Sequence, residues 1–282
     1  MVADDELLVG GARHLQSLLM QDSLLSEGTQ RRTEAVAFPL VPAARVIKIG
    51  GRLIDGGSET LLPLIDEVVQ ALSSYKLIIG AGAGIRSRHV FSVGLDLGLP
   101  TGVLAALSAT DAEQNAHILG ALLARYGVVS LPPPLITHLL PALLVLGSGV
   151  VVNGVPPFEL WEHPPSVGKI PPNRTDVGMY LLAEIYGSET VVLVKDVDGM
   201  YTADPKQEPG AEMIPYITVD ELVGSRPSTL PFDELLLDLL PHGHHCRRVQ
   251  IVDGTTPGML TDALAGQPVG TVIEASGGRR SE

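Results

Sequence analysis

From Arg45 onward, the chain alternates between short apolar runs and segments with helical periodicity, and most of the runs end in glycine-rich or charged turns. The run at 191–194 shows no polar alternation, which is typical of a strand covered on both faces. Strands that alternate with helices favour a parallel sheet, because each crossover returns the chain to the same end of the sheet. The sequence therefore predicts an α/β fold with a mostly parallel sheet between helical layers.

The same pattern gives the individual elements and the domain limits. We expect strands at 46–49, 76–79, 191–195 and 248–252, and helices at 61–72, 89–98, 111–126 and 175–186. Residues 1–43 carry no strand pattern, and we expect an N-terminal arm there that either packs on a neighbouring subunit or frays. One domain is expected over residues 44–276, followed by a C-terminal tail at 277–282.

The charge balance limits the partners of the chain. Its 19 Lys and Arg residues against 32 Asp and Glu residues give a net charge of −13. This argues against sequence-independent binding to nucleic acid, which needs cations to displace counterions from phosphates. Cys246 is the single cysteine and no signal or transit peptide is visible at the N-terminus, so we expect a cytoplasmic protein.

The stretch from Tyr126 to Phe158 contains no charged residue, which raises the question of a membrane span. Prolines and glycines interrupt it repeatedly. Prolines at this density deny a helix its backbone hydrogen bonds. We therefore expect no membrane association and interpret the stretch as buried strands and enclosed loops.

Two predicted strand ends carry glycine-rich loops that suit an anion. After the first strand, Gly50 and Gly51 allow close approach of the backbone, and Lys48 can reach the same anion as a point charge. After the second strand, Gly82 and Gly84 precede a helix whose N-terminus favours phosphate. Each loop by itself is equally consistent with a tight turn that binds nothing.

A third strand end combines a lysine, several acids, a glycine turn and an aromatic residue. It reads Lys195-Asp-Val-Asp-Gly-Met-Tyr-Thr-Ala-Asp-Pro205. Asp196 is the candidate Mg²⁺ ligand, because Mg²⁺ uses one or two carboxylates together with phosphate oxygens. The alternative is an aspartate that only stabilises a turn.

The order of these segments resembles the amino-acid kinase superfamily. Lys-x-Gly-Gly, the second glycine loop, the pair Thr175-Asp176 and Asp-Gly-x-Tyr-Thr-Ala-Asp-Pro occur in that sequence, and the resemblance runs from about residue 45 to 276. It implies a three-layer αβα sandwich with a mostly parallel central sheet. The end of the chain, at 257–271, is similar to that of bacterial UMP kinases.

Within this superfamily, the segments at 82–89, 91–100 and 170–176 resemble subunits of the molybdenum storage protein family. That family is a non-kinase branch that binds ATP and stores polyoxomolybdate. Gly50-Gly51-Arg52 also departs from the Ser-Gly-Glu usual in UMP kinases. The resemblance thus implies ATP, Mg²⁺ and molybdate or tungstate as ligands.

The resemblance also assigns roles to individual residues. Lys48, Gly50 and Gly51 would contact the triphosphate, and Gly82 and Gly84 would line the second anion loop. The segment around adenine and ribose would comprise Lys195, Asp196, Asp198, Gly199, Tyr201 and Asp204.

Further cations and one acid are candidates near the phosphates. Arg86, Arg88 and Arg174 suit oxyanions, because guanidinium groups are permanently charged forks. By resemblance, Asp176 matches the aspartate with which kinases of the superfamily organise lysines around the transferred phosphoryl group. Its alternative role is that of a helix N-cap.

The candidate ligands for a metal-oxide cluster are histidine and glutamate side chains. One type of storage subunit carries consecutive histidines after a Pro-Pro-aromatic element, whereas this chain has a single histidine there, His163. His163, Glu159 and Glu162 remain candidate oxometalate anchors. His138 is a further candidate, with a satisfied core histidine as the alternative.

The expected function is that of an ATP-binding store for molybdate or tungstate inside an oligomeric cage. The chain would assemble with itself or with a homologous second subunit, as a hexamer or a trimer of dimers, and would not be a true kinase, with slow ATP hydrolysis at most. The alternative is a UMP kinase-like phosphotransferase acting on a nucleoside monophosphate or a similar small substrate. A regulatory nucleotide sensor is a third class.

Overall fold

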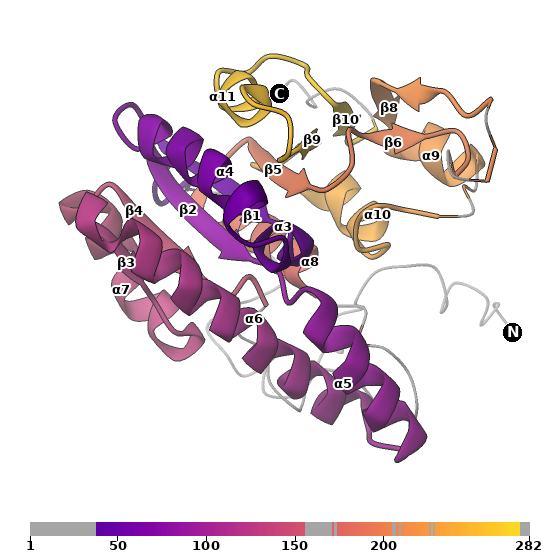
Figure 1. Ribbon diagram of the computed structural model, residues 1–282. Coiled ribbons are helices and arrows are strands. Elements are labelled where there is room, and N and C mark those ends of the chain that lie inside the picture. The colour runs from indigo at the N-terminus through magenta and orange to yellow at the C-terminus, as the bar shows by residue number, and fades with distance from the viewer. Residues whose placement is uncertain are drawn as a thin grey trace, which may run out of the picture. The chain divides into compact units, whose positions relative to one another are not determined.

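The computed structural model describes residues 38–155, 171, 174–204, 207–208, 210–225, 227 and 229–276. Its centre is an eight-stranded sheet (Figure 1). The strands follow the order β3 (Val128–Ser130), β4 (Gly149–Val152), β2 (Lys76–Ala81), β1 (Ala44–Ile49), β5 (Thr190–Lys195), β9 (Arg248–Asp253), β10 (Thr271–Glu274) and β8 (Tyr216–Thr218). Neighbouring strands of this sheet run parallel except β9 and β10. A small antiparallel ribbon pairs β6 (Met200–Tyr201) with β7 (Met213–Ile214).

Helices cover both faces of the sheet. One apolar cluster joins one face to α4 (Ser58–Ala71), α6 (Thr101–Leu123) and α11 (Met259–Leu264). The other cluster joins the opposite face to α7 (Pro133–Leu146), α8 (Thr175–Tyr186), α9 (Val219–Ser225) and α10 (Leu236–Leu239). The short helix α3 (Gly51–Asp55) follows β1, and α5 (Ile85–Asp96) follows β2. Short 3-10 turns, η2 (Ala124–Tyr126) and η3 (Leu240–His242), extend α6 and α10.

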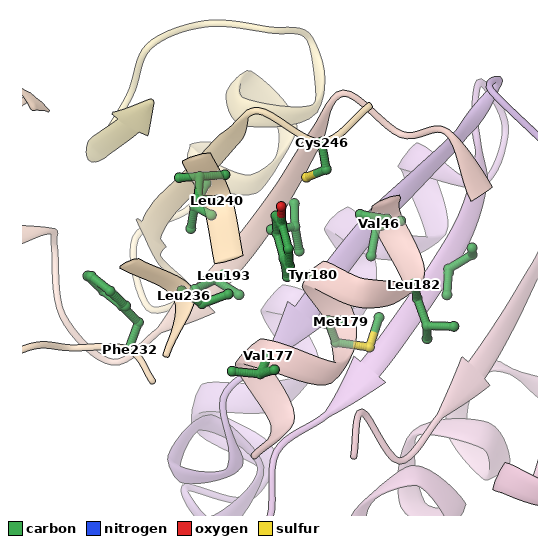
Figure 2. Packing of buried hydrophobic residues seen from close by; sticks show 14 of the residues in the cluster. Val46, Val177, Met179, Tyr180, Leu182, Leu193, Phe232, Leu236, Leu240 and Cys246 are labelled. Carbon is green, nitrogen blue, oxygen red and sulfur yellow. The ribbon is translucent and has the colours of Figure 1, made fainter. Parts of the chain in front are cut away.

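The side chains of β1 show how the two layers arise. Val46 belongs to the cluster under α8, whereas Ile47 and Ile49 belong to the cluster under α4. Both faces of the strand are therefore apolar, because successive side chains point to opposite faces of a sheet. In Figure 2, Met179 and Tyr180 of α8 lie in the first of these clusters together with Val46. The predicted three-layer α/β sandwich is confirmed.

Most predicted elements coincide with observed ones. The strands expected from the apolar runs are β1, β2, β5 and β9, and the helix expected at 175–186 is α8. The helices expected at 89–98 and 111–126 are α5 and α6, which begin earlier, at Ile85 and Thr101.

The interpretation of the charge-free stretch is wrong in one part. The stretch contains the expected buried strand β4, but residues 133–146 form the helix α7 rather than a loop. Pro133 begins this helix, where a missing N–H costs nothing, and only Pro141 lies in its interior. Ile136, Leu140 and Leu144 recur every four residues and are buried, so packing on the sheet offsets the bond lost at Pro141. Among the described helices, none combines the length and the apolar character that a membrane span requires.

Candidate functional site

A pocket of about 720 Å³ lies at the carboxyl ends of β1, β2 and β5 and at the N-terminus of α8. Ligands of open parallel sheets bind at this edge, because the loops that follow the strands converge there. Its charged lining residues are five cations and three acids: Lys48, Arg52, Arg88, Arg174, Lys195, Asp176, Asp196 and Asp233. The pocket is thus locally cationic within a chain of net charge −13.

Two lysines, the buried Lys48 and the largely buried Lys195, share one carboxylate at the base of this pocket. Lys48 Nζ lies 2.8 Å from Asp176 Oδ1, and Lys195 Nζ lies 2.6 Å from Asp176 Oδ2. Burial alone would raise the pKa of Asp176, but the neighbouring ammonium groups of Lys195 and Lys48 hold that pKa well below its usual range. Burial lowers the pKa of Lys195, and Asp176 opposes that shift. The arrangement presents two ordered cations to an anionic ligand.

The topology explains why these three side chains meet. β1 pairs with β5 in parallel register, so that Lys48 and Lys195 approach the same edge of the sheet. Asp176 is the second residue of α8, which packs on both strands. The N-cap position of this helix is Arg174, whose side chain makes no capping hydrogen bond, so the alternative that Asp176 serves as the N-cap is wrong. Its carboxylate faces the lysines instead.

The two glycine loops touch each other beside Lys48. A Cβ on Gly51 would lie 2.1 Å from the backbone nitrogen of Gly84, and one on Gly82 would lie 2.7 Å from the nitrogen of Gly51. Side chains there would force the loops apart. The Gly50 N–H donates to Val194 O and the Gly82 N–H donates to Ile49 O, so these two amides shape the loops rather than face an anion.

The N-terminus of α5 differs from the expectation of a phosphate seat. The Ile85 N–H donates to Asp55 Oδ2 at 2.7 Å, and a Cβ on Gly84 would lie 2.3 Å from the same oxygen. A carboxylate of the chain itself thus occupies the position expected for an anion. The candidate phosphate-binding groups in this part of the site therefore lie on the Lys48 side of the loops.

Arg86 and Arg88 point in different directions although they are two residues apart. Arg86 donates to Asn115 Oδ1 and lies 3.9 Å from Asp55, and it is absent from the pocket lining. Asn115 in turn donates to Gly82 O at 2.6 Å. Arg86 therefore stabilises the second glycine loop through Asn115. The exposed Arg88 lines the pocket instead.

Asp196 lies at the mouth of the pocket, directly after Lys195. Its Oδ2 accepts a hydrogen bond from Arg52 Nη1 at 3.0 Å, and the side chain is 36% exposed. Its Oδ1 has no hydrogen-bond partner within the described part of the chain. A carboxylate with one open oxygen beside a pocket whose charged lining residues are mostly cations fits the donor chemistry of a phosphate-bound Mg²⁺.

Asp233 is a lining residue for which the sequence analysis gave no role. Its Oδ1 pairs with Arg174 Nη2 at 2.8 Å, and its Oδ2 accepts the backbone N–H groups of Asp176 and Val177. The available signal was an acid at 233 within the apolar segment 230–240. Sequence alone could not show that this segment reaches α8.

The remaining candidates lie apart from the pocket or outside the described residues. Asp198, Gly199, Tyr201 and Asp204 do not line it; Tyr201 donates to Asp198 Oδ2 at 2.5 Å. His138 is exposed on α7 and does not line it either. Glu159, Glu162 and His163 fall in an undescribed segment. Within the residues that the structure does describe, no cluster of three or more His, Cys, Asp or Glu side chains could hold a metal ion.

Comparison with known sequences places this geometry in context. The family model described as "Amino acid kinase family" matches residues 44–253. The molybdenum storage protein subunit beta of Azotobacter vinelandii is 46% identical over 273 residues, which cover 95% of this chain and 100% of that protein. The uridylate kinase of Hyperthermus butylicus is 28% identical over 235 residues, covering 81% of this chain and 96% of that enzyme.

Solved structures show the same fold at lower identity. The uridylate kinase from Archaeoglobus fulgidus gives a TM-score of 0.63 at 21% identity and covers 81% of this chain and 99% of that one. The UMP kinase from Ureaplasma parvum gives a TM-score of 0.61 at 18% identity, covering 82% and 98%. These structures support the architecture of the sheet and its helical layers.

Proposed function

The chain belongs to the amino acid kinase family, and on that premise we propose that it is an ATP-binding subunit that stores molybdate or tungstate as polyoxometalate clusters. The observation that carries the proposal is the 46% identity to a molybdenum storage subunit along the whole length of that protein. The uridylate kinases are more distant. The enzyme of Hyperthermus butylicus is 28% identical over a smaller share of the chain. We expect the protein to work in the cytoplasm, in agreement with its single, buried Cys246.

The pocket supports ATP as the nucleotide. Lys48 and Lys195 would face the phosphates from the base of the pocket, and Gly51 and Gly84, which also line it, carry no side chain that would keep the phosphates from the backbone. Asp196 would hold Mg²⁺, whose charge would offset that of the phosphate oxygens. Arg88 and Arg174 line the same pocket and offer guanidinium groups to a second oxyanion. We propose that Asp198, Gly199, Tyr201 and Asp204, which follow the lining residues Asp196 and Val197 along the chain, contact adenine and ribose where these extend beyond the described lining.

Metal analysis after loading with ATP and molybdate tests the proposal. We expect the purified wild-type protein to retain molybdenum, and the Lys48→Ala variant to bind ATP more weakly by about ten- to a hundredfold, since one charge-assisted contact is lost. Arg125→Ala is a matched control, because this cation stacks on Tyr126 far from the pocket lining. Calorimetry without ATP binding, together with a protein free of bound metal, would refute the proposal.

The alternative is a phosphotransferase that acts on a nucleoside monophosphate. The buried Lys48, Asp176 and Lys195 favour it, because phosphoryl transfer requires positioned cations around the transferred group. A coupled assay for ADP release in the presence of UMP separates the two functions. Turnover above about 1 per second would support the kinase, since this is the low end of ordinary enzyme rates.

The ligands of the metal oxide are proposed from the sequence. His163 and Glu162 are the first to test, followed by Glu159 and His138, because imidazole and carboxylate groups can anchor an oxometalate. Loss of molybdenum from the His163→Ala protein with unchanged ATP affinity would assign the anchor. We further propose assembly into six chains or three pairs, either with itself or with a homologous subunit.

A further inference from the structure

Asp233 is an acid that is 5% exposed, in a pocket whose charged lining residues are mostly cations. Its Oδ2 accepts the N–H groups of Asp176 at 3.0 Å and of Val177 at 3.3 Å, and its Oδ1 pairs with Arg174. The first N–H groups of a helix have no partner within the helix. Asp233 therefore supplies, from 57 residues along the chain, the acceptor that an N-cap side chain normally supplies.

Apolar packing fixes Asp233 at this helix end. Its neighbour Phe232 and the following Leu236 are buried in the same cluster as Tyr180 of α8 (Figure 2). The Tyr180 hydroxyl also donates to Leu239 O at 3.1 Å. The segment that carries Asp233 is thus attached to α8 at several points, which fix the backbone of Asp233 beside the N-terminus of that helix.

The charge of Asp233 is unfavourable for the binding of an anion. Burial raises the pKa of Asp233, and the neighbouring Asp176 raises it further, whereas Arg174 lowers it. A buried acid whose only effect was its charge would repel a triphosphate in this pocket. Its two hydrogen bonds to the α8 backbone therefore indicate a role in geometry rather than in attraction.

We propose that Asp233 is the positioning residue of the site, which fixes the first turn of α8 and thereby holds the Asp176 carboxylate between Lys48 and Lys195. It acts through the α8 backbone and orders both ammonium groups for the ligand. The inference rests on the proposed function, in which that ligand is the triphosphate of ATP. Two substitutions separate geometry from charge: Asp233→Asn removes the charge but keeps an oxygen acceptor, whereas Asp233→Ala removes both.

The first measurement is calorimetric titration with Mg²⁺ and ATP. We expect Asp233→Ala to weaken binding by about tenfold, as for the loss of a charge-assisted hydrogen bond, and Asp233→Asn to stay within about threefold of the wild type. Glu234→Ala is the matched control, since Glu234 is the exposed neighbouring acid, and should leave the affinity unchanged. An Ala variant that binds ATP as well as or more tightly than the wild type would overturn the inference, because that is the effect of removing a repelling charge.

The second measurement needs no nucleotide. Hydrogen exchange at the Asp176 and Val177 amides should be faster in Asp233→Ala and close to wild type in Asp233→Asn. If the wild-type protein does not bind ATP, the proposed function fails, but unchanged protection of these amides in the Ala variant would separately refute the positioning role. If the Ala variant does not fold, the Asn variant decides: retained affinity and protection support the inference, and loss of either overturns it.

Discussion

Lys48 is buried and the neighbouring Lys195 is largely buried, and the chain tolerates these two cations because Asp176 lies between them. A buried charge is costly unless it is paired, and removing one partner leaves the others uncompensated. The pKa of Asp176 is held below its usual range. Its stabilising contribution is therefore complete above the ordinary carboxyl pKa and is lost as the pH falls below it toward the folded-state value.

We predict that Asp176→Asn lowers the free energy of unfolding at pH 7 by about 3 to 5 kcal/mol, the cost of breaking a buried ion pair. The pKa of Lys195 is already lowered by burial and by Lys48, and the substitution removes the group that opposes this shift. Between the lowered folded-state pKa of Lys195 and the ordinary lysine pKa, the unfolded chain binds more protons at Lys195 than the folded one, so that stability rises with pH in this range.

Urea unfolding at pH 7 and pH 9.5 checks this prediction. The difference in the free energy of unfolding between the Asn variant and the wild type should be smaller at the higher pH. Lys195 of the variant can release its proton there, which removes the uncompensated charge. Asp66→Asn, at an exposed acid of α4, serves as the control. A difference that grows with pH would contradict the assigned pairing.

At this scale the sequence predicted the lysines and Asp176 but not the direction of every side chain. Lys48 and Lys195 stand out because a lysine in an apolar strand needs a buried partner. Arg86 could not be separated from Arg88 without knowing which face of α5 lies against α6. Asp233 depends on a contact across 57 residues, and no local pattern reports such a contact.

At the scale of elements, the Asp55 carboxylate connects the end of α3 to the start of α5. It accepts the Ile85 N–H and lies 3.9 Å from Arg86. A negative group at a helix N-terminus is favourable, because it meets unpaired N–H groups and the positive end of the helix dipole. The glycine loop between β2 and α5 is therefore shaped by an internal anion.

We predict that Asp55→Ala destabilises the protein by about 1 kcal/mol, as for the loss of an N-cap. It should also speed hydrogen exchange at the first amides of α5. Thermal unfolding and exchange measured by mass spectrometry check both effects, with Asp66→Ala as the control. Unchanged protection at Ile85 would contradict the capping role.

Strands were predictable from the sequence because a run of apolar residues fits a strand buried on both faces, as β1 and β5 are. The helix α7 was not predicted from the sequence, because the density of prolines outweighed the four-residue spacing of Ile136, Leu140 and Leu144. Helical stability in proteins comes chiefly from packing of one face. That packing is visible only once the sheet is known.

For the whole molecule, the described surface of α7 leaves large apolar side chains exposed. Val145 is 74% exposed and Leu146 is 83% exposed. These side chains lie in a stretch without charged residues, 126–158, and apolar side chains gathered on one surface are typical of a contact with another protein. Contacts between copies would cover such a surface, which agrees with the proposed assembly.

We predict a closed oligomer of about six chains, since symmetric closed assemblies are the commonest form of homo-oligomers. Multi-angle light scattering of the purified protein checks the mass. Dilution of the protein to micromolar concentration should leave the measured mass unchanged. A stable monomer under these conditions would contradict both the assembly and the storage function.

The pocket is assembled from stretches that are far apart along the chain, from 48–52 through 82–95 and 174–176 to 195–197 and 230–233. During synthesis, the last of these leaves the ribosome long after the first. A nascent chain therefore cannot present the complete pocket until residue 233 has emerged. A ligand stabilises only a state that can bind it, so nucleotide can assist the folding of this protein only after residue 233 has left the ribosome.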